Sequence, residues 1–190
     1  MSDVPESHPR YQSLRLREAI VAGVDAGVTS PHGLIAHGRG EAYDYLIGEQ
    51  TAPWAVTAID AAAASLLRAR HPVLSVNGNT AALVGEELVA LSQAAKAPLE
   101  VNIFHPSSDR ERRISQFLRQ QGASEVLLPD GTTELPGLDS NRRFVHPAGI
   151  LDADVIFVPL EDGDRCEALR RLGRQVITVD LNPLSRTART

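Results

Sequence analysis

The feature that most constrains this chain is a repeated alternation of short apolar runs with segments of helical period. Apolar runs of strand length occur at residues 73–76, 99–104, 125–128, 155–160 and 176–181, and helical stripes lie between most of them. Strand, helix and strand in repetition favour a parallel sheet with right-handed crossovers. The sequence therefore predicts an α/β fold, a Rossmann-like parallel sheet with helices on both faces.

Two further helical patterns, at about residues 11–28 and 53–70, precede this region with no strand between them. Pro53 suits the first position of a helix. A chain of 190 residues, of which 43% are hydrophobic, has the usual size of one domain. We expect one domain over residues 1–190, with an N-terminal helical layer at 1–70 and a parallel-sheet core at 71–190.

Composition excludes several classes of partner. The net charge is −5 and aromatic residues make up 4%, so neither a basic surface for phosphate backbones nor a set of aromatic platforms for bases is expected. No apolar stretch reaches the ~18 residues of a membrane-spanning helix, and the N-terminus MSDVPESHPR lacks the apolar segment of a signal peptide. We expect a cytoplasmic protein that binds neither nucleic acid nor a membrane. The single cysteine, Cys166, falls on a helical stripe and is expected in the core.

Asn77-Gly78-Asn79 follows the first strand of the sheet region. Ligands of parallel sheets bind outside the carboxyl ends of the strands, so this segment is a candidate substrate site. Carboxamides offer donors and acceptors without charge, and the amides that open the next helix carry partial positive charge. An Asn-Gly turn with a helix cap would give the same pattern.

Arg17 is the polar member of a helical stripe formed by Leu14, Val21, Val24 and Val28. A guanidinium on such a face needs an anion. The pattern does not distinguish a structural carboxylate from a bound phosphate or carboxylate.

The densest polar cluster is GLIAHGRGEAYDYLIGE, residues 33–49. Gly38 and Gly40 flank Arg39, and glycines allow tight turns and close approach to a ligand. We predict that Arg39 binds an anion. His37 is a secondary candidate, because a lone histidine is more often structural.

Two later segments also follow strands. In PLEDGDR, residues 159–165, Asp162 or Asp164 is expected to cap a helix, which leaves a second carboxylate available for Mg²⁺. In DLNPLSRTA, residues 180–188, Asp180 and Asn182 offer acceptors for ribose or base, and Arg186 and Thr187 offer donors for phosphates. The connection at residues 129–149 lacks an apolar period, and we expect it at the cleft or at a subunit interface.

Five segments in this order, HPRYQSLRLRE, GLIAHGRGEAYDYLIGE, SVNGNTAALV, PLEDGDR and DLNPLSRTA, closely resemble the archaeal 4-phosphopantoate–β-alanine ligase family, also called phosphopantothenate synthetase. The resemblance runs from about His8 to Thr190. It implies a homodimeric Rossmann-like enzyme of coenzyme A biosynthesis. Such an enzyme joins 4-phosphopantoate to β-alanine and cleaves ATP to AMP and pyrophosphate through an acyl adenylate, with Mg²⁺ expected beside the ATP.

By matching positions, the resemblance implies that ATP contacts seven residues: Arg17, Arg39, Asp180, Leu181, Asn182, Arg186 and Thr187. It implies that His37, Asn77 and Asn79 line the cleft, and we expect Asn77, Gly78 and Asn79 to bind substrate. We predict catalytic roles for Arg39 and for His37, whose imidazole suits proton removal from the β-alanine amine near neutral pH.

The resemblance also implies that family members continue for several dozen residues past Thr190, so the sheet core is expected to be truncated there. A non-catalytic nucleotide-binding module remains the alternative function. A Rossmann dehydrogenase is disfavoured, because the chain carries no GxGxxG after a strand.

Overall fold

The structure, a computed structural model, describes residues 4–190 and contains a five-stranded parallel sheet in the order β3-β2-β1-β4-β5. The strands are β1 (Pro72–Val76), β2 (Leu99–Val101), β3 (Val126–Leu127), β4 (Val155–Phe157) and β5 (Gln175–Ile177). Each apolar run supplies one strand, so the predicted α/β fold is confirmed. The runs at 99–104, 155–160 and 176–181 extend past their strands, and their last residues line a pocket instead.

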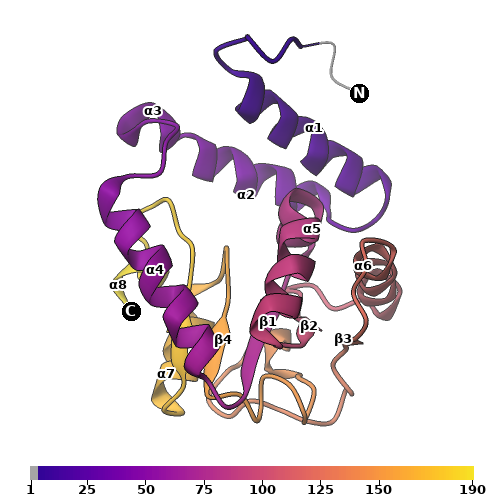
Figure 1. Cartoon of the computed structure of the whole chain (residues 1–190). Helices are drawn as coiled ribbons and strands as arrows, with labels where there is room; N and C mark the ends of the chain where they lie inside the picture. The colour runs from indigo at the N-terminus through magenta and orange to yellow at the C-terminus, as the bar shows by residue number, and fades with distance from the viewer. Residues whose placement is uncertain (1–3) are drawn as a thin grey trace.

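The N-terminal layer consists of α1 (Tyr11–Asp25), α2 (Pro31–Glu41), α3 (Asp44–Ile47) and α4 (Pro53–Arg68). The sheet region adds α5 (Gly78–Ala95), α6 (Ser108–Gln120), the 3-10 helix η1 (Asn141–Arg143), α7 (Gly163–Arg171) and α8 (Arg186–Arg189). In Figure 1, α1 and α2 lie across the end of the sheet at which α5 begins, and α4 runs down beside the sheet to the start of β1. The predicted N-terminal helical layer is therefore confirmed.

The core has two parts, one on each face of the sheet, because neighbouring residues of a strand point to opposite faces. On one face Leu74 and Leu99 pack with Leu88 of α5 and Ile114 of α6. On the other face the core contains Val73, Ile156, Val158 and, from α7, Cys166 and Leu169. The prediction of a buried Cys166 is confirmed, and burial raises the pKa of its thiol to about 11.

The long connection between β3 and β4 covers this second face in place of a crossover helix. Its side chains Leu135, Val145 and Ile150 are buried in the core there, and residues Glu134 and Phe144 form an isolated antiparallel bridge. The absence of an apolar period is explained by this irregular packing. The same connection carries Arg142 to the pocket, which confirms its expected place at the cleft.

Two expectations for the N-terminal layer were wrong. Residues 33–49 do not form a tightly turning glycine loop, because α2 runs through both Gly38 and Gly40. Also, the predicted stripe of α1 is buried only in part: Val28, just past the helix, is 2% exposed and Leu14 and Val24 are half-buried, but Val21 is 49% exposed. The buried residues within α1 are Ser13, Ile20 and Gly23. Gly23 decides this face, since a Cβ there would lie 2.6 Å from the Ala82 Cβ of α5.

Gly78 holds the N-terminal layer against the sheet. A Cβ at this position would lie 2.6 Å from the Val28 carbonyl oxygen and 3.0 Å from the Thr29 Cα. The turn between α1 and α2 thus crosses directly over the first residue of α5, at the carboxyl end of β1. None of the helices within residues 4–190 combines the length and the hydropathy needed to cross a bilayer.

Candidate active site

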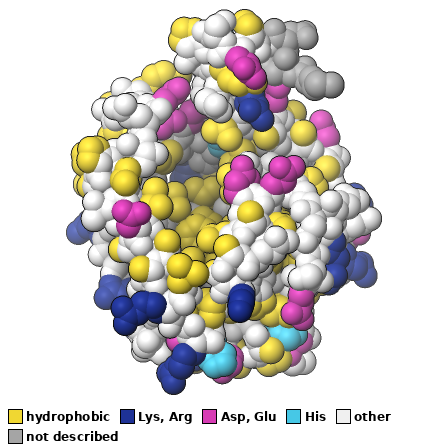
Figure 2. Space-filling view, viewed as in Figure 1, with side chains coloured by type: hydrophobic (Ala, Val, Ile, Leu, Met, Phe, Trp, Pro, Cys, Tyr) yellow, Lys and Arg dark blue, Asp and Glu magenta, His cyan; other side chains and the backbone are white. Residues whose placement is uncertain are grey.

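A pocket of about 470 Å³ lies between the carboxyl ends of the strands and the N-terminal layer. Residues that follow β1, β2, β4 and β5 line one side, and residues of α1, α2 and α3 line the other. Figure 2 shows the molecule hollowed beneath the N-terminal helices, with hydrophobic side chains around the opening. The strand order reverses between β1 and β4, and crevices at such a switch point are where open parallel sheets bind their ligands.

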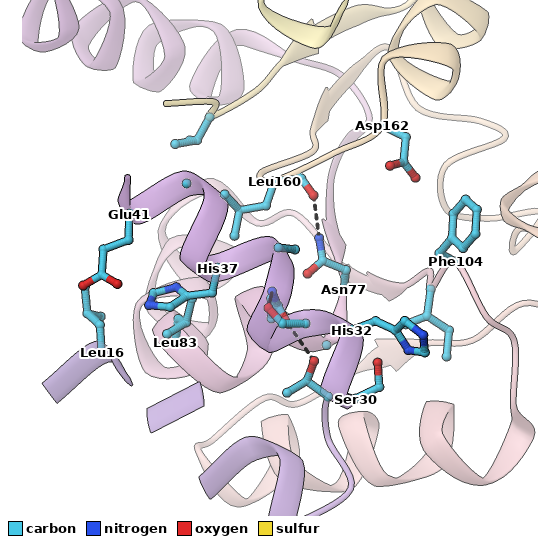
Figure 3. Close-up of a pocket in the computed structure, with 18 of the residues that line it drawn as sticks. Leu16, Ser30, His32, His37, Glu41, Asn77, Leu83, Phe104, Leu160 and Asp162 are labelled. Atoms are coloured by element: carbon cyan, nitrogen blue, oxygen red, sulfur yellow. Dashed lines mark hydrogen bonds between the residues drawn. The ribbon is translucent and has the colours of Figure 1, made fainter. Parts of the chain in front are cut away.

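Asn77 ties the ends of the two central strands together across this switch point. Its Nδ2 donates to the carbonyl oxygens of Pro159 (3.1 Å) and Leu160 (3.2 Å), as drawn in Figure 3 for Leu160. Its Oδ1 accepts from the backbone N–H of Thr80 at 3.0 Å and caps α5. Leu160 has a φ of 53°, which turns its carbonyl towards Asn77 at some cost in backbone strain.

Asn79 ties the N-terminal layer to α5. Its Nδ2 donates to the Gly33 carbonyl at 3.0 Å, and its Oδ1 accepts from the Thr29 hydroxyl at 2.6 Å. Both asparagine side chains therefore form hydrogen bonds within the protein, as the alternative of an Asn-Gly turn with a helix cap allowed. The backbone N–H groups of Gly78 and Asn79 remain available to a ligand, because the first residues of a helix have no acceptor within that helix.

His37, Glu41 and Asp44 form one end of the pocket. In Figure 3 the side chains of His37 and Glu41 lie at this end, on the side of Asn77 away from His32 and Phe104. The Nε2 of His37 is buried and has no hydrogen-bond partner within residues 4–190. Burial raises the pKa of Asp44, and the nearby carboxylates Glu49 and Glu41 raise it further.

Arg17 meets a structural carboxylate rather than open solvent. Its Nε donates to both oxygens of Glu41 at 2.8 and 3.0 Å, and its Nη2 lies 2.8 Å from Glu41 Oε1. Of the two alternatives for Arg17, the structure therefore shows the ion pair with a carboxylate of the protein. Glu41 lines the pocket, so this ion pair forms part of its wall.

The other end of the pocket is basic. His32 of α2 and His105 after β2 stack with ring centroids 5.5 Å apart, and Arg110 from the first turn of α6 lines the same end. Arg142 of η1 also lines the pocket, with its Nε 3.6 Å from Asp162 Oδ2. The sequence analysis did not predict Arg110 or Arg142 as site residues, because neither directly follows a strand. The charged pair Arg142-Arg143 within a long connection is the sequence feature that could have indicated Arg142.

A buried ion-pair cluster supports this basic end. The Glu161 carboxylate contacts Arg142 through one oxygen and Arg165 through the other, and Arg165 also donates to the Ser75 hydroxyl at 3.1 Å. Burial lowers the pKa of both guanidinium groups to about 10, so both remain charged at neutral pH. The Glu161 carboxylate is therefore paired with two arginines. Asp162 occupies the N-cap position of α7, as one alternative predicted, but its side chain makes no capping hydrogen bond.

The carboxyl-terminal segment is largely engaged with itself and with α7. Asp180 accepts hydrogen bonds from the Asn182 N–H (2.8 Å) and the Ser185 hydroxyl (2.5 Å). Arg186 pairs with Glu167, and the Thr187 hydroxyl donates to the Glu161 carbonyl at 2.8 Å. Leu181 is the member of this predicted ATP segment that lines the pocket.

A scan against protein families matches residues 54–190 to a family described as phosphopantothenate/pantothenate synthetase. Named 4-phosphopantoate–β-alanine ligases also match over nearly the whole chain. The ligase of Thermococcus kodakarensis is 54% identical over 190 residues, which make up 100% of this chain and 73% of the relative. The ligase of Methanosarcina mazei is 53% identical over 192 residues, which make up 100% of this chain and 75% of the relative. The ligase of Methanospirillum hungatei is 52% identical over 98% of this chain and 76% of the relative. The chain belongs to the phosphopantothenate synthetase family.

The pocket brings together five of the predicted site residues: His37, Asn77, Gly78, Asn79 and Leu181. Arg17, Asp180, Asn182, Arg186 and Thr187 lie outside the lining, each held by protein partners. Arg39 lies on the exposed side of α2, also outside the lining. The predicted ATP contacts of these residues remain predictions. No cluster of three or more side chains suited to a metal ion occurs in the described part of the chain.

Glu100 gives the protein a predicted pH dependence of stability. This fully buried residue of β2 accepts backbone hydrogen bonds from His146 (2.9 Å) and Ile150 (2.6 Å). Burial outweighs these bonds and raises its pKa from 4.5 to about 7. The folded state therefore holds a proton that the unfolded chain releases, so the stability from that proton is present at low pH and is lost as the pH rises through about 7.

We expect the wild type to lose on the order of 3 kcal/mol relative to Glu100→Gln as the pH is raised from about 4.5 to about 8. Glutamine resembles the protonated acid and does not titrate. Urea unfolding of both proteins across this range measures the difference. A constant difference between the two free energies of unfolding would contradict the raised pKa.

Proposed function

We propose that this protein is a cytoplasmic ligase that joins 4-phosphopantoate to β-alanine in coenzyme A biosynthesis and cleaves ATP to AMP and pyrophosphate. The observation that carries the proposal is one pocket at the switch point of the sheet, with arginines at one end and a buried, unpartnered imidazole nitrogen at the other. The 4-phosphopantoate–β-alanine ligases that match the chain support the choice of substrates.

The chemistry has two steps. The substrate carboxylate attacks the α-phosphorus of ATP, the bond to the bridging oxygen breaks, and pyrophosphate leaves with that electron pair. The neutral amine of β-alanine then attacks the acyl carbon of the adenylate, and AMP leaves with the electrons of the acyl–oxygen bond. The amine loses one proton during this second step, and the Nε2 of His37 is the buried acceptor at the pocket wall.

Mg²⁺ supplies neutralisation of phosphate charge when it is bound with ATP. It usually binds through one or two carboxylates together with substrate phosphates, and it keeps several waters. The acidic side chains that follow β4 do not fit this role, because the Asp162 carboxylate lies 3.6 Å from Arg142 Nε and Glu161 is enclosed by two arginines. The backbone amides of Gly78 and Asn79 are suited to bind an anionic oxygen of a substrate.

The reaction is tested by its nucleotide product. With 4-phosphopantoate and ATP alone, we expect labelled pyrophosphate to exchange into ATP, because pyrophosphate leaves before β-alanine is needed. With β-alanine added, AMP is expected as the product. Formation of ADP, with no exchange, would show attack at the γ-phosphorus and would contradict the proposed mechanism.

We also propose that two copies of the chain form a homodimer through α4. Only Leu66 of this helix is buried, whereas Trp54, Ile59 and Leu67 are 74%, 58% and 67% exposed. Hydrophobic side chains gather on the face along which α4 runs (Figure 2). Asp60 is the one charged residue between positions 53 and 67, so the surface that covers α4 must itself be apolar. The same helix of a second copy is such a surface and gives a self-complementary two-fold contact.

The dimer is tested by mass in solution. Ile59→Asp places a charge at the centre of the proposed contact and is expected to shift the wild-type dimer to a monomer in light scattering at micromolar concentration. Glu86→Gln, on the exposed side of α5, serves as the control and should leave the mass unchanged. A monomeric wild type, or a dimeric Ile59→Asp, would rule out this interface.

A further inference from the structure

We propose that Arg142, together with Arg110 and the first amides of α5, forms the subsite that binds the phosphate monoester of the acid substrate. The chemical class of the ligand is a phosphomonoester dianion, and its identity rests on the proposed function. Arg142 Nε lies 3.6 Å from Asp162 Oδ2, and Figure 3 shows Asp162 on the side of the pocket away from His37 and Glu41.

Arg142 is a buried donor in need of an acceptor. It is 6% exposed and lines the pocket. Its Nη1 contacts the Glu161 carboxylate, but its Nε makes no hydrogen bond within residues 4–190, with Asp162 Oδ2 3.6 Å away. Buried donors of folded proteins are nearly always satisfied, so an unpaired guanidinium N–H in a pocket wall indicates an acceptor supplied by a ligand.

The position of Arg142 is set before any ligand binds. Asn102, just past the end of β2, donates from Nδ2 to the carbonyl oxygens of Arg142 (3.2 Å) and Phe144 (2.9 Å). Asn102 is itself 1% exposed, and Glu161 past the end of β4 contacts the guanidinium. Two strand ends therefore hold the arginine from both sides, and little further ordering is needed when an anion arrives.

The charge balance favours an anion at this place. Arg142 and Arg165 are two buried cations that share one buried carboxylate, Glu161, whereas Asp162, the other carboxylate beside Arg142, is 47% exposed. Glu100, the other buried carboxylate near Arg165, is only partly ionised near neutral pH because its pKa is raised to about 7. The buried cluster thus carries excess positive charge, which a bound anion would neutralise.

The contrast between the two ends of the pocket orients the substrate. Arg110, His32 and His105 line the basic end, whereas Glu41 and Asp44 line the end that contains His37. A dianionic phosphate is attracted to the first end and repelled by the second. Its binding there directs the carboxylate of the same molecule along the pocket towards His37, where the amine is to attack.

The phosphate of the acid is favoured over the phosphates of ATP as the occupant. Arg142 lies deep in the wall, and the Asp162 carboxylate 3.6 Å from its Nε adds a negative charge beside it. A single phosphate group can contact Arg142 and the α5 amides while avoiding that carboxylate. A triphosphate would spread negative charge along it.

The test measures the affinity of the full chain for 4-phosphopantoate, pantoate and ATP by isothermal titration calorimetry. We expect the wild type to bind 4-phosphopantoate at least about tenfold more tightly than pantoate. Arg142→Gln should raise the dissociation constant of 4-phosphopantoate about 100-fold and leave those of pantoate and ATP nearly unchanged. Arg112→Gln removes the same charge from the exposed side of α6 and should change none of them.

Each other outcome is decisive. A wild type that binds both acids equally well would overturn the subsite, whether or not Arg142→Gln folds. If Arg142→Gln does not fold, Arg110→Gln replaces it, with the same expected loss of selectivity for the phosphate. Weaker binding of ATP, with unchanged binding of 4-phosphopantoate, would assign the subsite to the nucleotide instead and overturn the inference.

The experiment also separates the inference from the proposed function. If the wild type forms AMP from 4-phosphopantoate and β-alanine, but Arg142→Gln and Arg110→Gln bind that acid normally, the ligase stands and the subsite does not. If the wild type binds neither acid, both are overturned.

Discussion

His37→Ala is expected to lower kcat of the complete reaction about 10²- to 10⁴-fold while the exchange of pyrophosphate into ATP continues. The exchange reports only formation of the adenylate, which needs no proton acceptor. Attack by the amine does need one, and the buried Nε2 of His37 is free to serve in the described structure. Because that nitrogen has no hydrogen-bond partner within residues 4–190, its removal leaves no partner unsatisfied, and the melting temperature should change little.

The control for this experiment is His71→Ala. His71 lies before β1 at the opposite end of the strand, where its Nδ1 is 3.7 Å from Asp152 Oδ2 and its side chain is 61% exposed. Both reaction rates of this variant should match the wild type. If His37→Ala instead loses exchange and complete reaction in equal measure, His37 acts in adenylate formation or in binding, and its role as base for the amine is excluded.

Glu161→Ala is expected to lower the free energy of unfolding by about 3–5 kcal/mol, because it leaves two buried guanidinium groups without their shared carboxylate. Arg165 is fully buried, Arg142 is 6% exposed, and Glu161 contacts both. Both arginines stay charged at neutral pH, so neither escapes the loss by releasing a proton. Urea unfolding monitored by circular dichroism measures the change.

Glu167 provides a matched control for Glu161. It also contacts two arginines, with Oε2 at 2.9 Å from Arg171 Nη2 and 2.6 Å from Arg186 Nη2, but those arginine side chains are 70% and 60% exposed. Water solvates the arginines when this carboxylate is removed, so Glu167→Ala should change stability far less than Glu161→Ala. Equal losses for the two variants would contradict the view that burial decides the effect.

The predictions that the structure confirmed rest on local patterns, in which a short segment of the chain specifies its own structure. The five apolar runs became five parallel strands, because strand-length apolar segments separated by helices bury both sheet faces in one way. Pro53 begins α4, and Asn77 caps α5 through its own neighbour Thr80. These features depend on contacts within a few residues, which a sequence displays directly.

The predictions failed where distant segments decide the conformation. Gly38 and Gly40 were expected to make tight turns that approach a ligand, yet α2 runs through both of them, and the missing Cβ of Gly33 makes room for Asn79 and Thr29. The stripe of α1 was expected to be buried throughout, but the contact of Gly23 with Ala82 turns another face inward and leaves Val21 49% exposed. The partner in each case lies dozens of residues away, so helical periodicity alone does not reveal it.

By itself the sequence determined the α/β class, the N-terminal helical layer, the buried thiol of Cys166 and, through long motifs, the phosphopantothenate synthetase family. Only the tertiary structure decided which charges face the pocket. Arg17, which the family resemblance assigned to ATP, is held by Glu41, whereas Arg142, which the sequence analysis did not single out, lines the pocket with an unpaired Nε–H. The physical reason is that the need of a buried charge for a partner depends on distances across the fold, and periodicity along the chain contains no such distances.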